Sequence, residues 1–237
     1  NFPVYIDLND LGENDIDKIT NLKIIPYHGD NFARHLGVLL DPKLSYKYHF
    51  DAMFTKISRA VFSLRQMRNL LDGKHLNLLY NAYVKANIEY GSPLFTGVSA
   101  STLRPIFLLQ KRCVRTIKKL SYRAETKDFF KELGILPIDK MIVFNAAKTM
   151  FDYRYDLLPS SFNGTWKRNE ELREGDRVLR DDDDYFVRTL PTNFLKNLPL
   201  YKLPIIWNEL PIEIKQILNR KQFVKALHQH LVDSINH

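Results

Sequence analysis

Four consecutive aspartates, residues 181–184, are the part of this chain that most directly suggests metal chemistry. Polymerases and nucleases use carboxylates to hold two divalent metal ions about 3.5–4 Å apart. Such sites collect ligands from separate rigid elements, whereas adjacent acids in a polar loop repel one another. The run therefore favours a solvated acidic loop. The alternative, an enzyme built on this loop, predicts that alanine replacement of the four aspartates abolishes a metal-dependent activity.

Histidine, cysteine and glycine give no other catalytic pattern. The seven histidines are scattered, and His228 and His230 are two residues apart, so they diverge on a helix. The single cysteine, Cys113, falls on the apolar side of an expected helix, which is typical of a core residue. The sequence has no glycine-rich phosphate loop and no zinc-ligand spacing. It thus predicts no catalytic residue, no metal ligand and no cofactor in this chain.

Positive charge is concentrated in one part of the chain. The formal net charge is +8, but residues 43–123 alone contain 15 basic and 3 acidic residues, a net charge of +12. This concentration favours a polyanion partner, and a solvated, lysine-rich helix surface is the alternative. The candidate phosphate-binding side chains on two expected helices are Lys56, Arg59, Arg68, Lys111, Arg112, Arg115 and Lys118.

Hydrophobic periodicity predicts a mainly α fold with a short N-terminal β-hairpin. The hairpin is expected between residues 22–25 and 32–40, around a turn at 27–31. Apolar side chains recur every three or four positions in a set of later segments, which is typical of amphipathic helices. These expected helices are 45–71, 74–89, 101–120, two within 125–156, and 221–235, with an acidic loop near 165–190.

The faces of these helices can also be predicted. Phe54 in the first helix and Tyr83 in the second belong to the apolar stripes and are expected in the core. Ser101 or Thr102 is expected to cap the third helix. Lys111, Arg115 and Lys118, spaced by four and three, then share the side of that helix opposite its apolar stripe.

Length and composition indicate a soluble intracellular protein. A chain of 237 residues with 45% hydrophobic residues can bury a core without disulfides. One cysteine cannot form an internal disulfide and fits a reducing compartment. No apolar run approaches the roughly 18 residues that span a bilayer, so no membrane partner is expected. The sequence does not distinguish nucleus from cytoplasm.

Several short segments occur in an order that resembles one known family. Residues 33–41, followed by Leu44-Ser45-Tyr46 and His49, resemble the segment just after the catalytic palm in reverse transcriptases of non-LTR, jockey-like LINE retrotransposons. Further segments resemble later blocks of that family in the same order: residues 56–60, 78–80, 88–91, 109–115, 133–137, 157–162 and 207–211. Each segment is short, and their order and spacing together carry the resemblance.

The resemblance implies a role for each part of the chain. Residues 1–42 would be the end of the palm with a primer-grip-like hairpin, 43–125 a basic helical thumb, and 126–237 a helical C-terminal region. His35, Leu36 and Gly37 would lie at or beside the hairpin tip, where a glycine lets nucleic acid approach the backbone. The implied partners are an RNA–DNA template–primer hybrid and the palm and fingers of the same polyprotein.

The resemblance also implies where catalysis takes place. The family's catalytic aspartates, which hold Mg²⁺ in the full enzyme, lie in the palm, upstream of these residues. Aspartates near the start, such as Asp7 and Asp10, lack the apolar strand that flanks that motif. The chain is therefore expected to hold the hybrid and not to polymerise alone. The alternative is a stand-alone, non-enzymatic nucleic-acid-binding or scaffolding module derived from such an element.

Overall fold

The computed structural model describes residues 32–172, 184–187 and 189–236 and confirms a mainly α fold with an N-terminal β-hairpin. The first group of elements is β1 (Ala33–His35), β2 (Val38–Leu40), α2 (Lys47–Gln66), η2 (Met67–Asn69), α3 (Gly73–Tyr80), the π-helical turn η3 (Asn81–Lys85), α4 (Ala86–Glu89), η4 (Ser92–Phe95) and α5 (Ala100–Ile117). The second group is α6 (Lys127–Glu132), α7 (Ile138–Arg154), η5 (Ser160–Phe162), η6 (Asn169–Leu172), α8 (Asn193–Lys196), α9 (Pro199–Asn208), α10 (Ile212–Lys215), α11 (Arg220–Asp233) and η7 (Ser234–Asn236).

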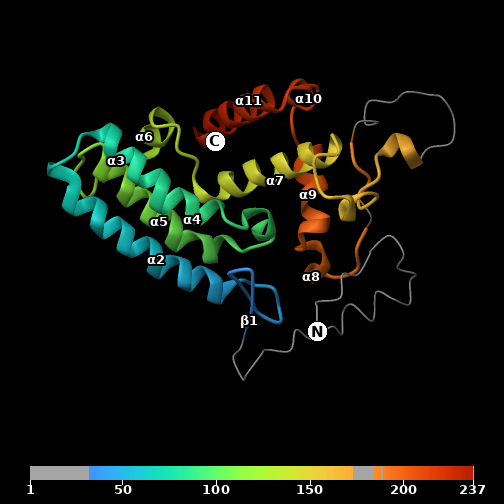
Figure 1. The fold of residues 1–237 in the computed structure, drawn as a ribbon, viewed down its shortest axis with the longest axis horizontal. Helices are drawn as coiled ribbons and strands as arrows, with labels where there is room; N and C mark the ends of the chain where they lie inside the picture. Colours follow the sequence, from blue (N-terminus) through green and yellow to red (C-terminus); the bar gives the residue numbers. More distant parts are fainter. Residues whose placement is uncertain (1–31, 173–183, 188, 237) are drawn as a thin grey trace.

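Helix α7 is the central element of the arrangement. Figure 1 shows α2 to α5 together at one end of the molecule, with α7 extending from this group toward α9. Helix α7 packs against α4, α5, η4, α9 and α11. One hydrophobic core consequently extends from Val38 in β2 to Val232 in α11. The core is continuous across residue 125, and the division into segments there stays a prediction.

The β-hairpin lies within residues 33–40. Ala33 pairs with Leu40 and His35 with Val38, so Leu36 and Gly37 form the turn. Both turn residues have positive φ, 45° and 84°, as a two-residue type I′ turn requires. The expectation that 32–40 is one strand is therefore wrong: it folds back on itself, because Gly37 accepts the left-handed conformation. The expected partner strand at 22–25 and the turn at 27–31 lie outside the described residues.

A buried carboxylate organises the start of α2. Asp41 accepts hydrogen bonds from the backbone N–H groups of Ser45 (3.1 Å) and Tyr46 (2.7 Å) and from the Ser45 hydroxyl (3.0 Å). Tyr46 occupies the N-cap position with φ of 57°, and its own side chain makes no capping bond. Asp41 thus satisfies backbone donors that would otherwise lack partners at this helix end.

The amphipathic helices form broadly where the apolar periodicity predicts them. Cys113 is buried in α5, as expected for a core residue. Two expected core residues are instead on the surface: Phe54 is 40% exposed and Tyr83 is 60% exposed, because each lies at the edge of its stripe. The N-cap of α5 is Ser99, whose side chain accepts from the backbone N–H of Thr102, so the expected cap at Ser101 or Thr102 is displaced by two or three residues.

Gln110, fully buried in α5, connects three segments. Its Nε2 group donates to the Tyr80 hydroxyl (3.0 Å) and to the Leu136 carbonyl (3.1 Å). Its Oε1 atom accepts from the backbone N–H of Ile138 (2.9 Å). The side chain therefore ties α3 and the start of α7 to α5. Every polar atom of this buried amide has a partner, as buried polar groups require.

The C-terminal elements pack around a second aromatic cluster within the same core. Trp207 of α9 is fully buried against Phe223 of α11, and Phe223 stacks on Phe151 of α7 with ring centroids 4.3 Å apart. Asn208 bonds both backbone groups of Tyr185, with Nδ2 donating to the carbonyl (2.8 Å) and Oδ1 accepting from the N–H (2.9 Å). The segment around Tyr185 is thereby held against α9.

One aspartate of the acidic run has a structural partner. Asp184 accepts from the buried Lys215 ammonium at 2.6 Å, and the same ammonium donates to the Asn208 carbonyl at 2.9 Å. Residues 181–183 lie outside the described residues. Within the described ranges no helix is long and apolar enough to cross a bilayer.

We expect the protein to lose stability as the pH falls below about 6.5, through His49 of α2. His49 is buried against Phe95, its Nε2 atom has no partner in the described structure, and burial lowers its pKa. A lowered folded-state pKa means that the neutral ring stabilises the fold above the unfolded-state pKa, and that this stabilisation is lost as the pH falls toward the folded-state value. Urea unfolding at pH 7.5 and 5.5 measures the effect. The variant His49→Phe should lose less stability between these pH values, and an equal loss would contradict the assignment.

Candidate nucleic-acid interface

The hairpin tip is exposed and fixed in position. The Leu36 side chain is 78% exposed, and His35 and Gly37 are exposed beside it. The Tyr90 hydroxyl donates a hydrogen bond to the Leu36 carbonyl, and a Cβ atom at Gly37 would lie 3.6 Å from the Tyr90 ring. These contacts hold the tip against the turn that follows α4. A leucine at positive φ is an unfavourable backbone conformation, and such conformations cluster at functional sites.

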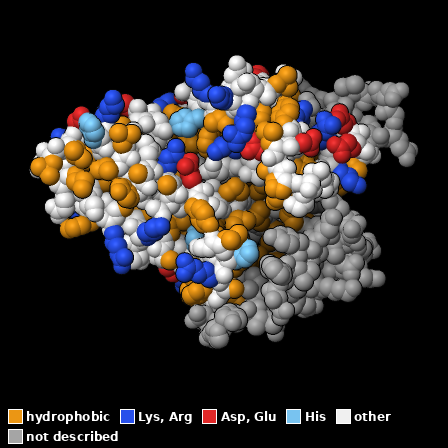
Figure 2. All heavy atoms as spheres, in the orientation of Figure 1, with side chains coloured by type: hydrophobic (Ala, Val, Ile, Leu, Met, Phe, Trp, Pro, Cys, Tyr) orange, Lys and Arg blue, Asp and Glu red, His pale blue; other side chains and the backbone are white. Residues whose placement is uncertain are grey.

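The expected cations of α2 divide into two kinds. Lys56 and Arg59 are exposed on the helix, and neither side chain forms an ion pair or hydrogen bond with another described residue. Figure 2 shows that Lys and Arg side chains are distributed over the face of the molecule in view. Arg68, in the 3₁₀ turn after α2, is half-buried, and its Nη2 group donates to the Leu120 carbonyl at 3.1 Å. Arg68 therefore connects the end of α2 to the end of α5, and Lys56 and Arg59 are available to a ligand.

The expected cations of α5 differ in the same way. Arg112 is exposed, and the Lys111 ammonium lies 4.8 Å from the centroid of the Phe107 ring. Arg115 donates from Nε to the Ala124 carbonyl at 2.9 Å. Lys118 forms an ion pair with Glu132 at 2.5 Å. The Glu132 carboxylate thus offsets part of the positive charge of Lys118. Arg115 bonds a neutral carbonyl through Nε, so it keeps its positive charge, and its Nη groups can still donate to a ligand.

A groove contains two of the basic residues expected to bind phosphate and three further basic residues that are not among those candidates. The groove has a volume of about 650 Å³ and lies between α5, the segment 123–127, the start of α7 and the segment 234–235. Lys111 and Arg115 line one wall. Arg123, Lys127 and Lys140 are the additional cations. Against these five positive charges the groove has two carboxylates, Glu125 and Asp139, so its net charge is positive.

Unused hydrogen-bonding groups also face this groove. Helix α7 begins here, and the backbone N–H groups of Asp139 and Lys140, in its first turn, have no acceptor among the described residues. The N-terminus of a helix presents free N–H groups and a partial positive charge, which favours phosphate oxygens. The groove therefore combines cationic side chains with backbone N–H donors at the start of α7.

The three additional cations have no common signal in the sequence. Arg123 precedes α6, Lys127 begins it, and Lys140 lies in the first turn of α7. Lys127 and Lys140 belong to residues 124–237, whose formal charge is neutral. The groove forms because α7 and the segment after α11 are brought beside α5, which local spacing does not encode. The structure does not place Lys56 or Arg59 of α2 in the groove.

The side chains found here do not form a metal centre. Across the described ranges no three His, Cys, Asp or Glu side chains converge so that they could hold a metal ion. Burial raises the pKa of the Cys113 thiol to about 12, so this thiol stays protonated at neutral pH. Comparison with models of known protein families, with curated proteins and with solved structures found no match.

Proposed function

We propose that this chain holds a template–primer hybrid by its phosphates, as the downstream portion of a non-LTR retrotransposon reverse transcriptase would. The observation that carries the proposal is the basic groove, where Lys111 and Arg115 meet Arg123, Lys127 and Lys140. Basic side chains that come from separate elements of one folded unit can contact successive phosphates. Such contacts hold a nucleic acid and do not depend on its base sequence. The segments that resemble the family, in their order along the chain, support the identification of the parent enzyme.

The hairpin supports the same proposal. In the proposed enzyme the exposed tip formed by Leu36 and Gly37 would contact the primer end, and Tyr90 would fix its position. Catalysis would belong to palm aspartates outside this chain, with Mg²⁺ as their metal. The chain alone is expected to bind a hybrid and to add no nucleotides to it.

Binding of a labelled RNA–DNA hybrid, followed by fluorescence anisotropy at several salt concentrations, tests this function. If four to six phosphates are neutralised, the logarithm of the affinity should fall against the logarithm of salt with a slope of roughly −4 to −5. The triple variant Lys111→Glu, Arg123→Glu and Lys140→Glu should abolish binding, because it replaces three groove cations by anions.

A matched triple variant controls for total charge. Lys167, Lys221 and Lys225 are exposed and do not line the groove, so their replacement by glutamate changes the net charge by the same amount. This control should retain most of the affinity. Equal losses in the two triple variants, or no binding by the unmodified chain at low salt, would contradict the proposal. Binding of duplex DNA as tight as that of the hybrid would favour the stand-alone binding module.

A further inference from the structure

The basic groove also contains an apolar surface that phosphate binding does not use. Leu103 and Phe107 of α5 line the groove together with Ile235, and each of these side chains is half-buried. Phosphate groups gain nothing from contact with such a surface, and its exposure to water is unfavourable. The ligand that fits the whole groove therefore has an apolar part as well as negative charge.

The apolar and the cationic surfaces are separated along α5. Four lining residues of this helix follow one another at intervals of four: Leu103, Phe107, Lys111 and Arg115. The first two are apolar and the last two are basic. Since an α-helix rises about 1.5 Å per residue, one such interval covers about 6 Å. The wall thus changes from apolar to cationic over a distance comparable to that between the base and the phosphate of one nucleotide.

Phe107 is the aromatic side chain at the point where the two surfaces meet. Its ring packs against the buried Phe130 with centroids 5.8 Å apart, and the Lys111 ammonium lies 4.8 Å from its centroid. Lys111 forms no ion pair with a described residue, so its flexible side chain can turn from the ring to a phosphate. Stacking of a base on an aromatic ring is stronger than a cation–π contact at an exposed site. A base can therefore replace the ammonium on the Phe107 ring.

A base reaches this surface only when it is unpaired. In a double helix the faces of the bases are stacked on one another, and only the base edges are exposed in the grooves. Proteins that hold single strands combine a cationic groove with aromatic side chains on which bases stack. The volume of about 650 Å³ is that of a cleft which encloses a ligand of nucleotide size. We propose that the groove binds an unpaired stretch of nucleic acid, with one base against Phe107 and the neighbouring phosphates at Lys111 and Arg115.

The two carboxylates of the groove are compatible with this ligand. Glu125 and Asp139 are exposed, and they repel phosphates. A carboxylate can accept hydrogen bonds from the amino groups of bases and from ribose hydroxyls, which a single strand presents. Because every base has a face that can stack, we expect little dependence on base sequence.

The inference deepens the proposed function and rests on it, because the unpaired stretch would continue one strand of the bound hybrid. Fluorescence anisotropy with the full chain compares three labelled probes: a blunt RNA–DNA hybrid, the same hybrid with four unpaired nucleotides on the RNA strand, and that extended hybrid with abasic residues in the extension. Extensions at the 5′ and 3′ ends are tested separately. The abasic extension keeps the phosphates and removes the bases. At one end or both, the normal extension should bind at least about fivefold more tightly than the abasic one, the lower limit for one stacked base.

Two variants assign this difference to the groove. Phe107→Leu keeps an apolar side chain and removes the ring, and it should reduce the difference between normal and abasic extensions to less than about twofold. Phe186→Leu is the same change at an exposed position that does not line the groove, and it should leave the difference intact.

Three results would overturn the inference: equal binding of normal and abasic extensions at both ends, an equal loss in the two variants, or no gain from any extension. The last result is expected if the groove instead holds an acidic amphipathic helix of a protein partner. Binding of the blunt hybrid in any of these cases would leave the proposed function standing. Base-dependent binding of an extended probe without binding of the blunt hybrid would overturn the proposed function alone.

Discussion

Replacement of Gly97 by alanine should lower the free energy of unfolding by about 3 kcal/mol or more, the upper part of the range for overpacked sites. An added Cβ atom at Gly97 would lie 2.0 Å from the backbone carbonyl oxygen of Asn197 and 2.7 Å from the carbonyl carbon. Real Cβ atoms do not approach backbone so closely, so either the turn after η4 or the end of α8 must move. In a domain of this size the loss corresponds to a fall of about 6–12 °C in the melting temperature.

Gly164→Ala is the matched control for this prediction. Gly164 has φ of 76°, but a Cβ atom there would meet no atom within 4 Å. Its replacement by alanine should cost about 1 kcal/mol, from the backbone conformation alone. Urea unfolding of the two variants separates close packing from conformational strain. A smaller loss in Gly97→Ala than in Gly164→Ala would contradict the observed contact between the two segments.

Gln110→Met should destabilise the protein by about 3–5 kcal/mol, because it leaves several buried groups without partners at once. The side chain volume is nearly kept, but the Leu136 carbonyl, the Ile138 N–H and the Tyr80 hydroxyl lose their partner. Each buried group left unpaired costs about 1–3 kcal/mol. The free energy of unfolding from urea titration measures the sum.

A double-mutant cycle with Tyr80→Phe apportions the effect. The Tyr80 side chain is fully buried and donates no bond to another described residue, and burial raises its pKa, so its hydroxyl is neutral. Tyr80→Phe alone should cost about 1 kcal/mol, since Gln110 keeps two of its three bonds. The same replacement should be close to neutral in the Gln110→Met background, because the interaction is then already lost. Additive losses would show that the Gln110–Tyr80 contact carries no energy.

The fold class and most helices could be predicted because they depend on local periodicity. The spacing of Phe50, Met53, Ile57 and Leu64 identifies α2, and all four are buried. The expected position of the hairpin is wrong because the tight turn at Leu36-Gly37 has a leucine where asparagine or glycine is usual. The expectation that Phe54 and Tyr83 lie in the core is wrong because periodicity does not determine how wide a face the neighbouring helices cover.

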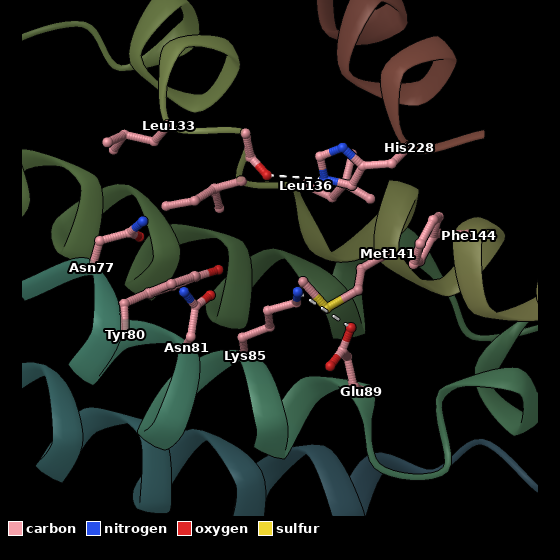
Figure 3. A pocket seen from close by; sticks show the side chains of 12 residues that line it. Asn77, Tyr80, Asn81, Lys85, Glu89, Leu133, Leu136, Met141, Phe144 and His228 are labelled. Carbon is pink, nitrogen blue, oxygen red and sulfur yellow. Dashed lines mark hydrogen bonds and ion pairs between the residues drawn. The ribbon is translucent and has the colours of Figure 1, made fainter. Parts of the chain in front are cut away.

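The candidate site could be predicted only in part, since it is assembled from distant segments. Lys111 and Arg115 were identified from charge on one helix face, and both line the groove. Arg68 and Lys118 satisfied the same criterion, but the structure gives them partners at Leu120 and Glu132, which local spacing cannot reveal. His228 and Asn77, which line a pocket of about 160 Å³ (Figure 3), are some 150 positions apart in the sequence, and tertiary packing, including that of α11 against α7, brings them together.

The position of Ile235 in the groove wall has a consequence for biosynthesis. Ser234 and Ile235 close the groove against α5, although they are more than 100 residues from Lys111 along the chain. A ribosome makes the cationic helices first, and the groove remains open on one side until residue 235 has been added. Newly made α5 can pack on α2 and α3, which precede it, but part of the groove wall beside its basic residues is still missing at that stage. Domains with such long-range closure expose hydrophobic surface while they fold, which is the condition in which chaperones act.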